Sequence, residues 1–227
     1  MTLTDEVRAT CAEIAAQAHP VGIDLDAVAE VQPAAVAELD PERHYLEGDP
    51  ADVADYMLAL DAINFGSGWF GTLRKRTFEG ALDLVAVAGD SAERLAEMLT
   101  RGMAMFDDHG FYKRAQIVPN DLALAGVAEF GDLDRLTIFA DNLVPHVLRC
   151  DGVLVYDDEL AARIDGGVSL EIGGAEREIR ACAVHACELI SQRTGVPAGT
   201  IDTWLWTRGQ APEYKAHPRH RCRTVFY

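Results

Sequence analysis

The sequence predicts a mainly α-helical fold with at most a small β-hairpin. Apolar residues recur three and four positions apart along most of the chain, as in Val7, Cys11 and Ile14, and this spacing forms one face of a helix. No series of alternating strands interrupts these segments. With 227 residues, 49% of them hydrophobic, the chain can bury a sizeable core. We therefore expect one domain over residues 1–227, with room for two helical lobes about one cleft.

The first half of the chain contains clear helix starts. We expect helices here over residues 4–18, 24–38 and 91–106. A fourth begins where Asp49 precedes Pro50, because an aspartate side chain caps free N–H groups and proline needs no N–H partner at that position. The apolar spacing places Asn64 on the inward face of this helix, which should stop at Gly66.

The second half continues the helical pattern. The stretch "NDLALAGVAEFGDLDRLTIFADNLVPHVLR" indicates two helices, with Asp132 capping the second. A short helix is expected over residues 157–165, closed by Gly166 and Gly167. A small hairpin around Gly173–Gly174 fits "VSLEIGGAEREI". Two last helices cover "EIRACAVHACELISQR" and "GTIDTWLW".

Charge and residue spacing exclude several classes of function. The formal net charge of −17 repels nucleic-acid phosphates, so no polynucleotide partner is expected and a DNA-repair glycosylase is disfavoured. No apolar run is long enough for a membrane span, and the acidic N-terminus lacks a signal peptide's pattern, which favours the cytoplasm. Five cysteines without a CxxC pair and seven histidines without an HExxH pattern indicate neither a disulfide framework nor a metal site.

One acidic residue stands out within "TIFADNLVPHVLR". If this stretch is a helix, Asp141 shares an apolar face with Ile138, Val144 and Leu148. Pro145 lacks an N–H, so the carbonyl of Asp141 loses its usual helical donor. A carboxylate in such a place must be paired or functional. Two interpretations stand: a structural acid satisfied by an arginine or a helix end, or a catalytic group.

Two further places put polar and aromatic side chains together. Asp202 lies four residues before Trp206, so the pair could grip a planar heterocycle by stacking and hydrogen bonding; equally, Asp202 could complement a helix dipole. Asn64 is followed by Phe65 and Trp69 in "NFGSGWF", which could line an aromatic pocket or simply form a helix end and core packing.

Several of these motifs occur in a specific order. "HYLEG", "DAINFGSGWF", "FYKRAQI", the long "LDRLTIFADNLVPHVLRCDGVLVYDDELAARID", "EIRACAVHACELI", "IDTWLW" and the terminal "HRCRTVFY" follow one another along the chain. Together they resemble the queuosine salvage protein family, the queuosine 5′-phosphate N-glycosylases, from about Val7 to the C-terminus. The resemblance implies a helical architecture like that of DNA glycosylases. It also implies hydrolysis of the N-glycosidic bond of free queuosine 5′-monophosphate, with release of the 7-deazaguanine base queuine for tRNA modification, without a metal or organic cofactor.

The resemblance also implies roles for individual residues. The aspartate of the family's "FAD" motif falls on Asp141 as the catalytic carboxylate, and Asp202 would hold the base. The remaining candidates for substrate binding are His44, Asn64, Phe65, Trp69, Lys113, Arg114, Phe139, Trp206 and Thr207. Among these, Lys113 and Arg114 of "YKRAQ" fit a polar or phosphate-binding role.

This chain departs from the family pattern near the site. Where the family most often has "FADYRVPQ", Asn142, Leu143 and His146 replace the tyrosine, arginine and glutamine. Thr207 stands where an acid often follows the late aromatic residue. These changes keep two alternatives open: an N-glycosylase for another modified nucleoside monophosphate, or a nucleobase-binding protein without catalysis.

Overall fold

The computed structural model describes residues 1–63 and 80–227 of the chain. This part is mainly helical, which confirms the predicted fold class. Its α-helices are α1 (Leu3–Gln17), α2 (Leu25–Glu30), α3 (Pro50–Ile63), α4 (Ala81–Ala88), α5 (Ala92–Gly102), α6 (Lys113–Leu124), α7 (Val144–Cys150), α8 (Asp158–Asp165), α9 (Gly174–Thr194), α10 (Ala198–Arg208) and α11 (Pro212–Lys215). Two 3₁₀ turns and two strands complete it: η1 (Ala104–Phe106), η2 (Leu133–Arg135), β1 (Val21–Ile23) and β2 (Leu154–Tyr156).

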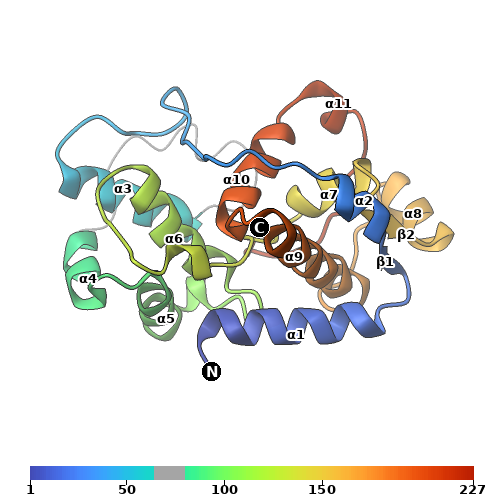
Figure 1. Cartoon of the computed structure of the whole chain (residues 1–227), viewed down its shortest axis with the longest axis horizontal. Coiled ribbons are helices and arrows are strands. Elements are labelled where there is room, and N and C mark those ends of the chain that lie inside the picture. Colours follow the sequence, from blue (N-terminus) through green and yellow to red (C-terminus); the bar gives the residue numbers. More distant parts are fainter. Residues whose placement is uncertain (64–79) are drawn as a thin grey trace.

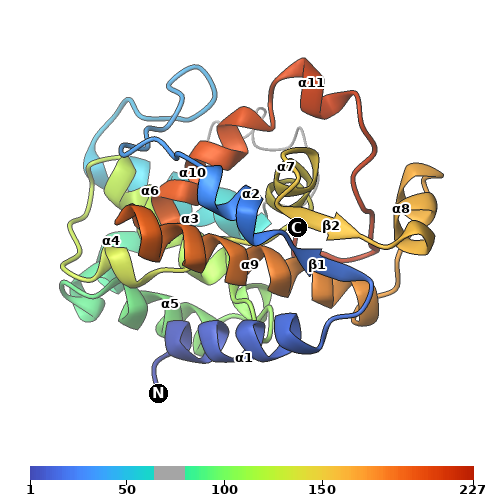
Figure 2. The same ribbon diagram turned by 45° about the vertical axis from the view of Figure 1, so that its right-hand side comes forward.

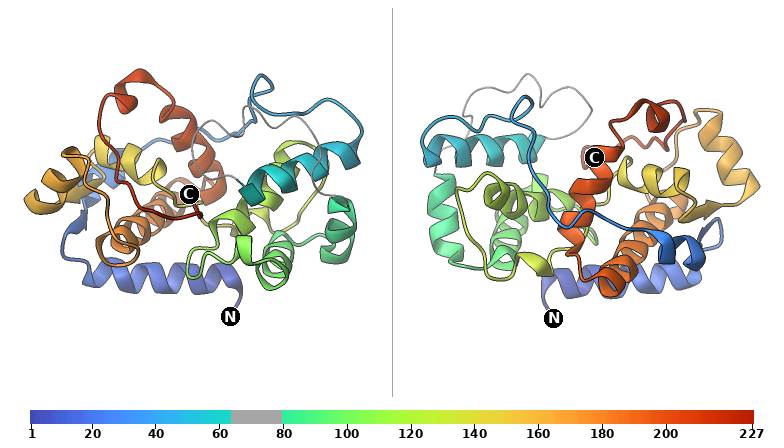
Figure 3. Two further views of the ribbon diagram at one scale, coloured as in Figure 1. Left: turned by 180° about the vertical axis from the view of Figure 1, so that it is seen from behind. Right: turned by 45° about the horizontal axis from the view of Figure 1, so that its top comes forward.

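The helices gather in two groups joined by long elements. Figure 1 shows α3 to α6 at one end of the molecule and α2, α7, α8 and the two-stranded sheet at the other. In the turned view of Figure 2, α4 and α8 still lie at opposite ends. α1 runs along one edge and packs against both α9 and α5, so it spans the two groups. α10 lies between them, in contact with α7 and α9, as the two views of Figure 3 also show.

Most of the expected helices are present because their starts and stops are local. Asp49 caps α3, since its Oδ1 accepts the N–H groups of Ala51 at 2.9 Å and Asp52 at 3.1 Å. α8 ends where Gly166 follows it. The expected stop of α3 at Gly66 lies outside the described residues.

The predicted hairpin at Gly173–Gly174 is wrong. Both glycines have positive φ angles, and instead of turning a strand they lead into α9. The N–H of Gly173 donates to the carboxylate of Glu176 at 3.3 Å, which closes this helix start. Instead, the sheet pairs β1 with β2, which run antiparallel with Val21 opposite Tyr156. The two strands lie so far apart in the sequence that no local pattern could predict their pairing.

The boundaries expected around Asp132 are also wrong. α6 begins earlier, at Lys113, and a non-helical stretch follows η2 until α7. Asp132 caps α5 rather than a helix of its own: its carboxylate accepts the N–H of Ala92 at 2.5 Å and the hydroxyl of Ser91 at 2.6 Å. The helix expected over residues 24–38 ends at Glu30, because the chain turns extended ahead of Pro33. α4 and α11 were not predicted.

One large apolar cluster forms the core of the described part. It contains side chains from α1 to α11, among them Val7, Ile179 and Leu205, each of which is at most 1% exposed. A smaller cluster lies beside it, formed by Ala92, Ile117, Leu136 and Phe139. Within residues 1–63 and 80–227, no helix combines the length and the apolarity that crossing a membrane requires.

Candidate active site

Asp141 does not lie within a helix, so that part of the prediction is wrong. Residues 136–140 are non-helical, and Asp141 follows them at a bend just before α7. Its Oδ1 accepts the N–H groups of Leu143 at 2.7 Å and Val144 at 3.1 Å. Pro145 is the second residue of α7, where a missing N–H costs no hydrogen bond. The carboxylate and the proline are therefore compatible because both belong to a helix start.

Side chains from three helices hold the backbone that leads to Asp141. Gln116 of α6 accepts the N–H of Thr137 at 2.9 Å and donates to its hydroxyl at 3.0 Å. Arg180 of α9 donates from Nε to the carbonyl of Ala140 at 2.9 Å. Both of these side chains are buried. The segment 136–140 is thus fixed by buried hydrogen bonds rather than by its own secondary structure.

Asp202 of α10 provides a third attachment and a second carboxylate. Its Oδ1 accepts the N–H of Phe139 at 2.8 Å, two residues before Asp141. Asp202 is only 6% exposed. Burial, followed by the negative charge of Asp141, raises the pKa of Asp202 to about 8. Asp202 therefore keeps its proton at neutral pH in the empty site.

Lys113 supplies the positive charge of this site. It is the first residue of α6, its side chain is 4% exposed, and its Nζ lies 3.9 Å from Oδ2 of Asp141. The ammonium also acts to lower the pKa values of Asp61, Asp121 and Asp202. Four aspartates, Asp61, Asp121, Asp141 and Asp202, thus surround one lysine; we call these four the acidic cluster.

His44 lies near Asp121 of the acidic cluster. It is 9% exposed, and its charge acts to lower the pKa of Asp121. The Nδ1 of His44 lies 2.9 Å from the carbonyl of Asp40. Since a carbonyl only accepts, Nδ1 is the protonated nitrogen in this arrangement.

The other predicted residues are placed less uniformly. Arg114 donates to the carbonyls of Ala62 at 2.9 Å and Met105 at 3.3 Å, and so ties α6 to the end of α3. Phe139 buries its ring in the smaller apolar cluster and offers its N–H to Asp202. Trp206 is half-buried one helical turn after Asp202, whereas Thr207 is exposed. Asn64, Phe65 and Trp69 lie outside the described residues.

Three residues near the site were missed by the sequence analysis. Asp61 interrupts the apolar run "MLALDAI", the same signal that singled out Asp141. Asp121 follows Asn120, and this polar pair resembles an ordinary helix start. His220 is 2% exposed, and burial lowers its pKa to about 3 even though Asp141 opposes this shift. Its carbonyl accepts the side-chain N–H of Asn142 at 3.5 Å.

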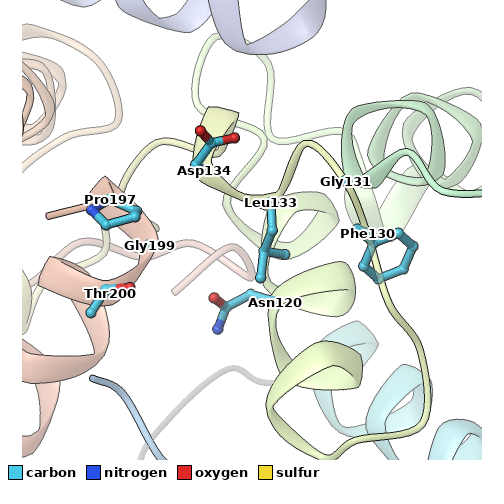
Figure 4. A pocket seen from close by; sticks show the side chains of 8 residues that line it. All are labelled: Asn120, Phe130, Gly131, Leu133, Asp134, Pro197, Gly199 and Thr200. Carbon is cyan, nitrogen blue, oxygen red and sulfur yellow. The ribbon is translucent and has the colours of Figure 1, made fainter. Parts of the chain in front are cut away.

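One hollow in the described part of the chain lies next to this site, not within it. It has a volume of about 310 Å³ and is lined by Asn120, Phe130, Gly131, Leu133, Asp134, Pro197, Gly199 and Thr200. Figure 4 shows these side chains between α6, η2 and the start of α10. None of the acidic cluster lines it, so the hollow does not mark the reacting centre.

The fold and the site define a helical protein in which the buried carboxyl group of Asp202 and the partly exposed carboxylate of Asp141 lie on two different elements that a hydrogen bond joins. The chain belongs to the queuosine salvage protein family, whose model matches residues 69–227. This confirms the resemblance carried by the sequence motifs.

Individual relatives agree with this membership. The queuosine 5′-phosphate N-glycosylase/hydrolase of Dictyostelium discoideum is 35% identical over 69% of this chain and 55% of its own length. The protein of that name from Mus musculus is 30% identical over the same two shares. The one from Sphaerobacter thermophilus is 29% identical over 97% of each chain, in an alignment of 315 positions. The chain thus spans about half the length of two of these relatives, and the third contains segments that its 227 residues lack.

Proposed function

We propose that this chain hydrolyses the N-glycosidic bond of queuosine 5′-phosphate and releases the base queuine. The supporting observation is the hydrogen bond from the N–H of Phe139 to Asp202, which holds the two family-motif aspartates near one another. The names of the relatives supply the substrate. The partner is accordingly a free nucleotide, and no step below requires a metal or an organic cofactor.

Asp141 is assigned to the sugar side of the reaction. Cleavage of an N-glycoside passes through a state in which the anomeric carbon carries positive charge. A carboxylate fixed beside that carbon stabilises the charge, and a water-poor setting strengthens the effect. The two N–H groups that Oδ1 accepts hold the carboxylate in one orientation. Its Oδ2 lies 3.9 Å from Nζ of Lys113.

Asp202 is assigned to the base side. A 7-deazapurine has carbon in place of the basic N7 of a purine, so it cannot be protonated there as it leaves. Bonds to its polar edge must then absorb the electron density that it gains. Because the pKa of Asp202 is raised to about 8, its carboxyl group can donate such a bond at neutral pH. Two carboxyl groups with different protonation states are a recurring arrangement in glycoside cleavage.

A nucleotide panel tests the proposed function directly. The purified protein is incubated with queuosine 5′-phosphate, queuosine and the four common nucleoside monophosphates, and released bases are separated by chromatography. We expect queuine from queuosine 5′-phosphate above all. Release from a different nucleotide would support the alternative substrate, and binding without release from any of them would support a nucleobase-binding protein.

We also propose a cytoplasmic location. All five cysteines are unpaired, and Cys11, Cys182 and Cys187 are buried thiols, which suits a reducing compartment. Fractionation of cells that express the protein, with immunodetection, tests this location.

A further inference from the structure

Asp61 is a buried acid whose hydrogen-bonding capacity is unused. It lies on α3, it is 1% exposed, and neither carboxylate oxygen has a hydrogen-bond partner. A carboxyl group in such a place normally costs free energy, because water is removed and nothing replaces it. Its neighbours in the acidic cluster differ: Asp141 accepts two backbone N–H groups and Asp202 accepts one.

The position of Asp61 is fixed by the contact between α3 and α6. Arg114 of α6 donates to the carbonyl of Ala62 at 2.9 Å, which places the neighbouring Asp61 beside the start of α6. Asp121 lies further along the same helix and accepts the side-chain N–H of Asn120 at 3.0 Å. Asp121 and Lys113 both act on the pKa of Asp61, so its carboxyl group lies near these two side chains.

Lys113 does not neutralise the pair formed by Asp61 and Asp121 directly. Its recorded ion pair is with Asp141, and no ion pair of the described residues includes Asp61. Burial is the main cause of two pKa shifts here. It raises the pKa of Asp61 well above its ordinary value and raises the pKa of Asp121 to about 6. Asp61 and Asp121 thus place two carboxyl groups on one side of the acidic cluster, and neither oxygen of Asp61 has a hydrogen-bond partner. A cation bound there would favour the ionised form of both groups.

We propose that Asp61 and Asp121 form a subsite for a protonated amine of the substrate. This inference rests on the proposed function and deepens it. Queuine differs from the plain 7-deazaguanine ring by a secondary amine on a methylene group, and such an amine is a cation at neutral pH. An ammonium provides donors only and carboxylates provide acceptors only, so the two groups complete each other.

The subsite explains how the chain selects its substrate. Guanine nucleotides have the same polar edge but no amine, and their binding would leave Asp61 buried without a partner. A site that is built to pair a polar group rejects analogues lacking that group, since its own buried acceptor stays unsatisfied. Asp61 and Asp121 are therefore specificity-determining residues, distinct from the residues assigned to bond cleavage.

Binding of two bases to the same variants tests the subsite. Queuine and 7-deazaguanine are titrated by calorimetry into the wild-type protein and into Asp61→Asn, Asp121→Asn and Asp158→Asn. Asp158 is exposed on α8, at the end of the molecule opposite α3 (Figures 1 and 2), so this variant removes the same charge away from the site. We expect the wild type and Asp158→Asn to prefer queuine by at least about tenfold.

Asp61→Asn should lose that preference while its affinity for 7-deazaguanine stays within about twofold of the wild type. Asp121→Asn should lose part of it, and this variant serves if Asp61→Asn does not fold. Equal weakening of both bases, or an unchanged preference in both variants, would overturn the subsite. Base binding does not depend on turnover, so failure of the nucleotide panel would count against the proposed function alone.

A second readout uses protons. An ammonium favours the ionised form of nearby carboxyl groups, so queuine binding near neutral pH should release protons from the wild-type protein. Titrations in buffers of different ionisation enthalpy measure this number. We expect a smaller release from Asp61→Asn than from Asp158→Asn, and equal release from the two would contradict the subsite.

Discussion

The carboxylate of Asp141 has two tasks that a single substitution separates. One oxygen caps the start of α7, and the negative charge is proposed to stabilise the positive charge on the sugar. In Asp141→Asn the amide oxygen can still accept the N–H groups of Leu143 and Val144, but the charge is gone. We expect an unfolding temperature within a few degrees of that of the wild type. We expect kcat to fall about a hundredfold to a thousandfold or more. Single-turnover release of queuine measures it.

Asp157 offers a matched control for this change. It is exposed and caps α8, accepting the N–H of Leu160 at 2.8 Å. Asp157→Asn is therefore the same chemical change at another helix start, and it should leave kcat unaltered. Comparable losses in the two variants would show that capping, not charge at the site, explains the effect.

The raised pKa of Asp202 has a consequence for stability. An unfolded aspartate titrates near about 4, whereas the pKa of Asp202 in the fold is about 8. Between these values the folded chain holds a proton that the unfolded chain has released, so stability falls as the pH rises. Burial lowers the pKa of His220 to about 3, and this opposite effect ends near about pH 6.5. The contribution of Asp202 is therefore clearest between about pH 6.5 and 8.

We expect the stability of Asp202→Asn to fall less steeply with pH than that of the wild type, because the folded variant no longer binds this proton. A single proton corresponds to about 1.4 kcal/mol per pH unit at most. Urea unfolding of the wild type and the variant across the same pH window measures both slopes. Identical slopes would mean that Asp202 is already ionised in the folded protein.

At the scale of elements, the junction of α7 and α10 controls the position of Asp141. A methyl group on Gly209, at the end of α10, would lie 2.8 Å from Cδ1 of Leu143 and 3.0 Å from Cγ2 of Val147. The N–H of Leu143 holds the carboxylate of Asp141. Gly209→Ala should therefore destabilise the fold by about 1–3 kcal/mol through overpacking and lower kcat as well.

Gly102 at the end of α5 is the appropriate comparison, because a methyl group there meets nothing within 4 Å. Gly102→Ala should leave activity unchanged and stability equal or higher by up to about 1 kcal/mol. Thermal unfolding and kcat of both variants decide the matter. If Gly209→Ala behaves like Gly102→Ala, then the junction adapts without moving Asp141.

What could be predicted at this scale depended on how far apart the bonding partners lie. Asp49 caps α3 through residues two and three positions away, and that start was evident in the sequence. The segment 136–140 was mistaken for a helix because its partners are remote. Thr137 bonds to Gln116, 21 positions away, and Phe139 to Asp202, 63 positions away. Tertiary hydrogen bonds thus override a local apolar spacing that favours a helix.

The candidate site shows the same division. Asp141 and Asp202 were predicted individually, from a carboxylate among apolar neighbours and from an acid one turn before a tryptophan. Their convergence with Lys113 depends on α6, α10 and the non-helical segment before α7 meeting, which no spacing within one helix reveals. Asp61 carried a readable signal that was overlooked, whereas the role of Asp132 in capping α5 from 40 positions away carried none.

For the whole molecule, we infer a single folding unit. The main apolar cluster includes side chains from both groups of helices, and α1 packs against α9 and α5. Neither group can lose its packing without exposing the face of α1 that covers it. We therefore expect one cooperative thermal transition, with the calorimetric enthalpy equal to the van't Hoff enthalpy. A calorimetric enthalpy clearly above the van't Hoff value would instead indicate two lobes that unfold separately.

The neighbouring positions of Asp202 and Trp206 on α10 give the protein a built-in optical signal. A purine ring held by Asp202 would lie within reach of the half-buried indole one turn away, and stacking of that kind quenches emission. The guanidinium carbon of Arg208 lies 4.7 Å from the ring centroid of Trp204. The fluorescence of Trp204 should therefore change little when a ligand binds. Replacing Trp206 with phenylalanine would then remove the contribution of this indole to the ligand-dependent emission and leave that of Trp69. Occupancy of the unlabelled protein could thus be followed in real time.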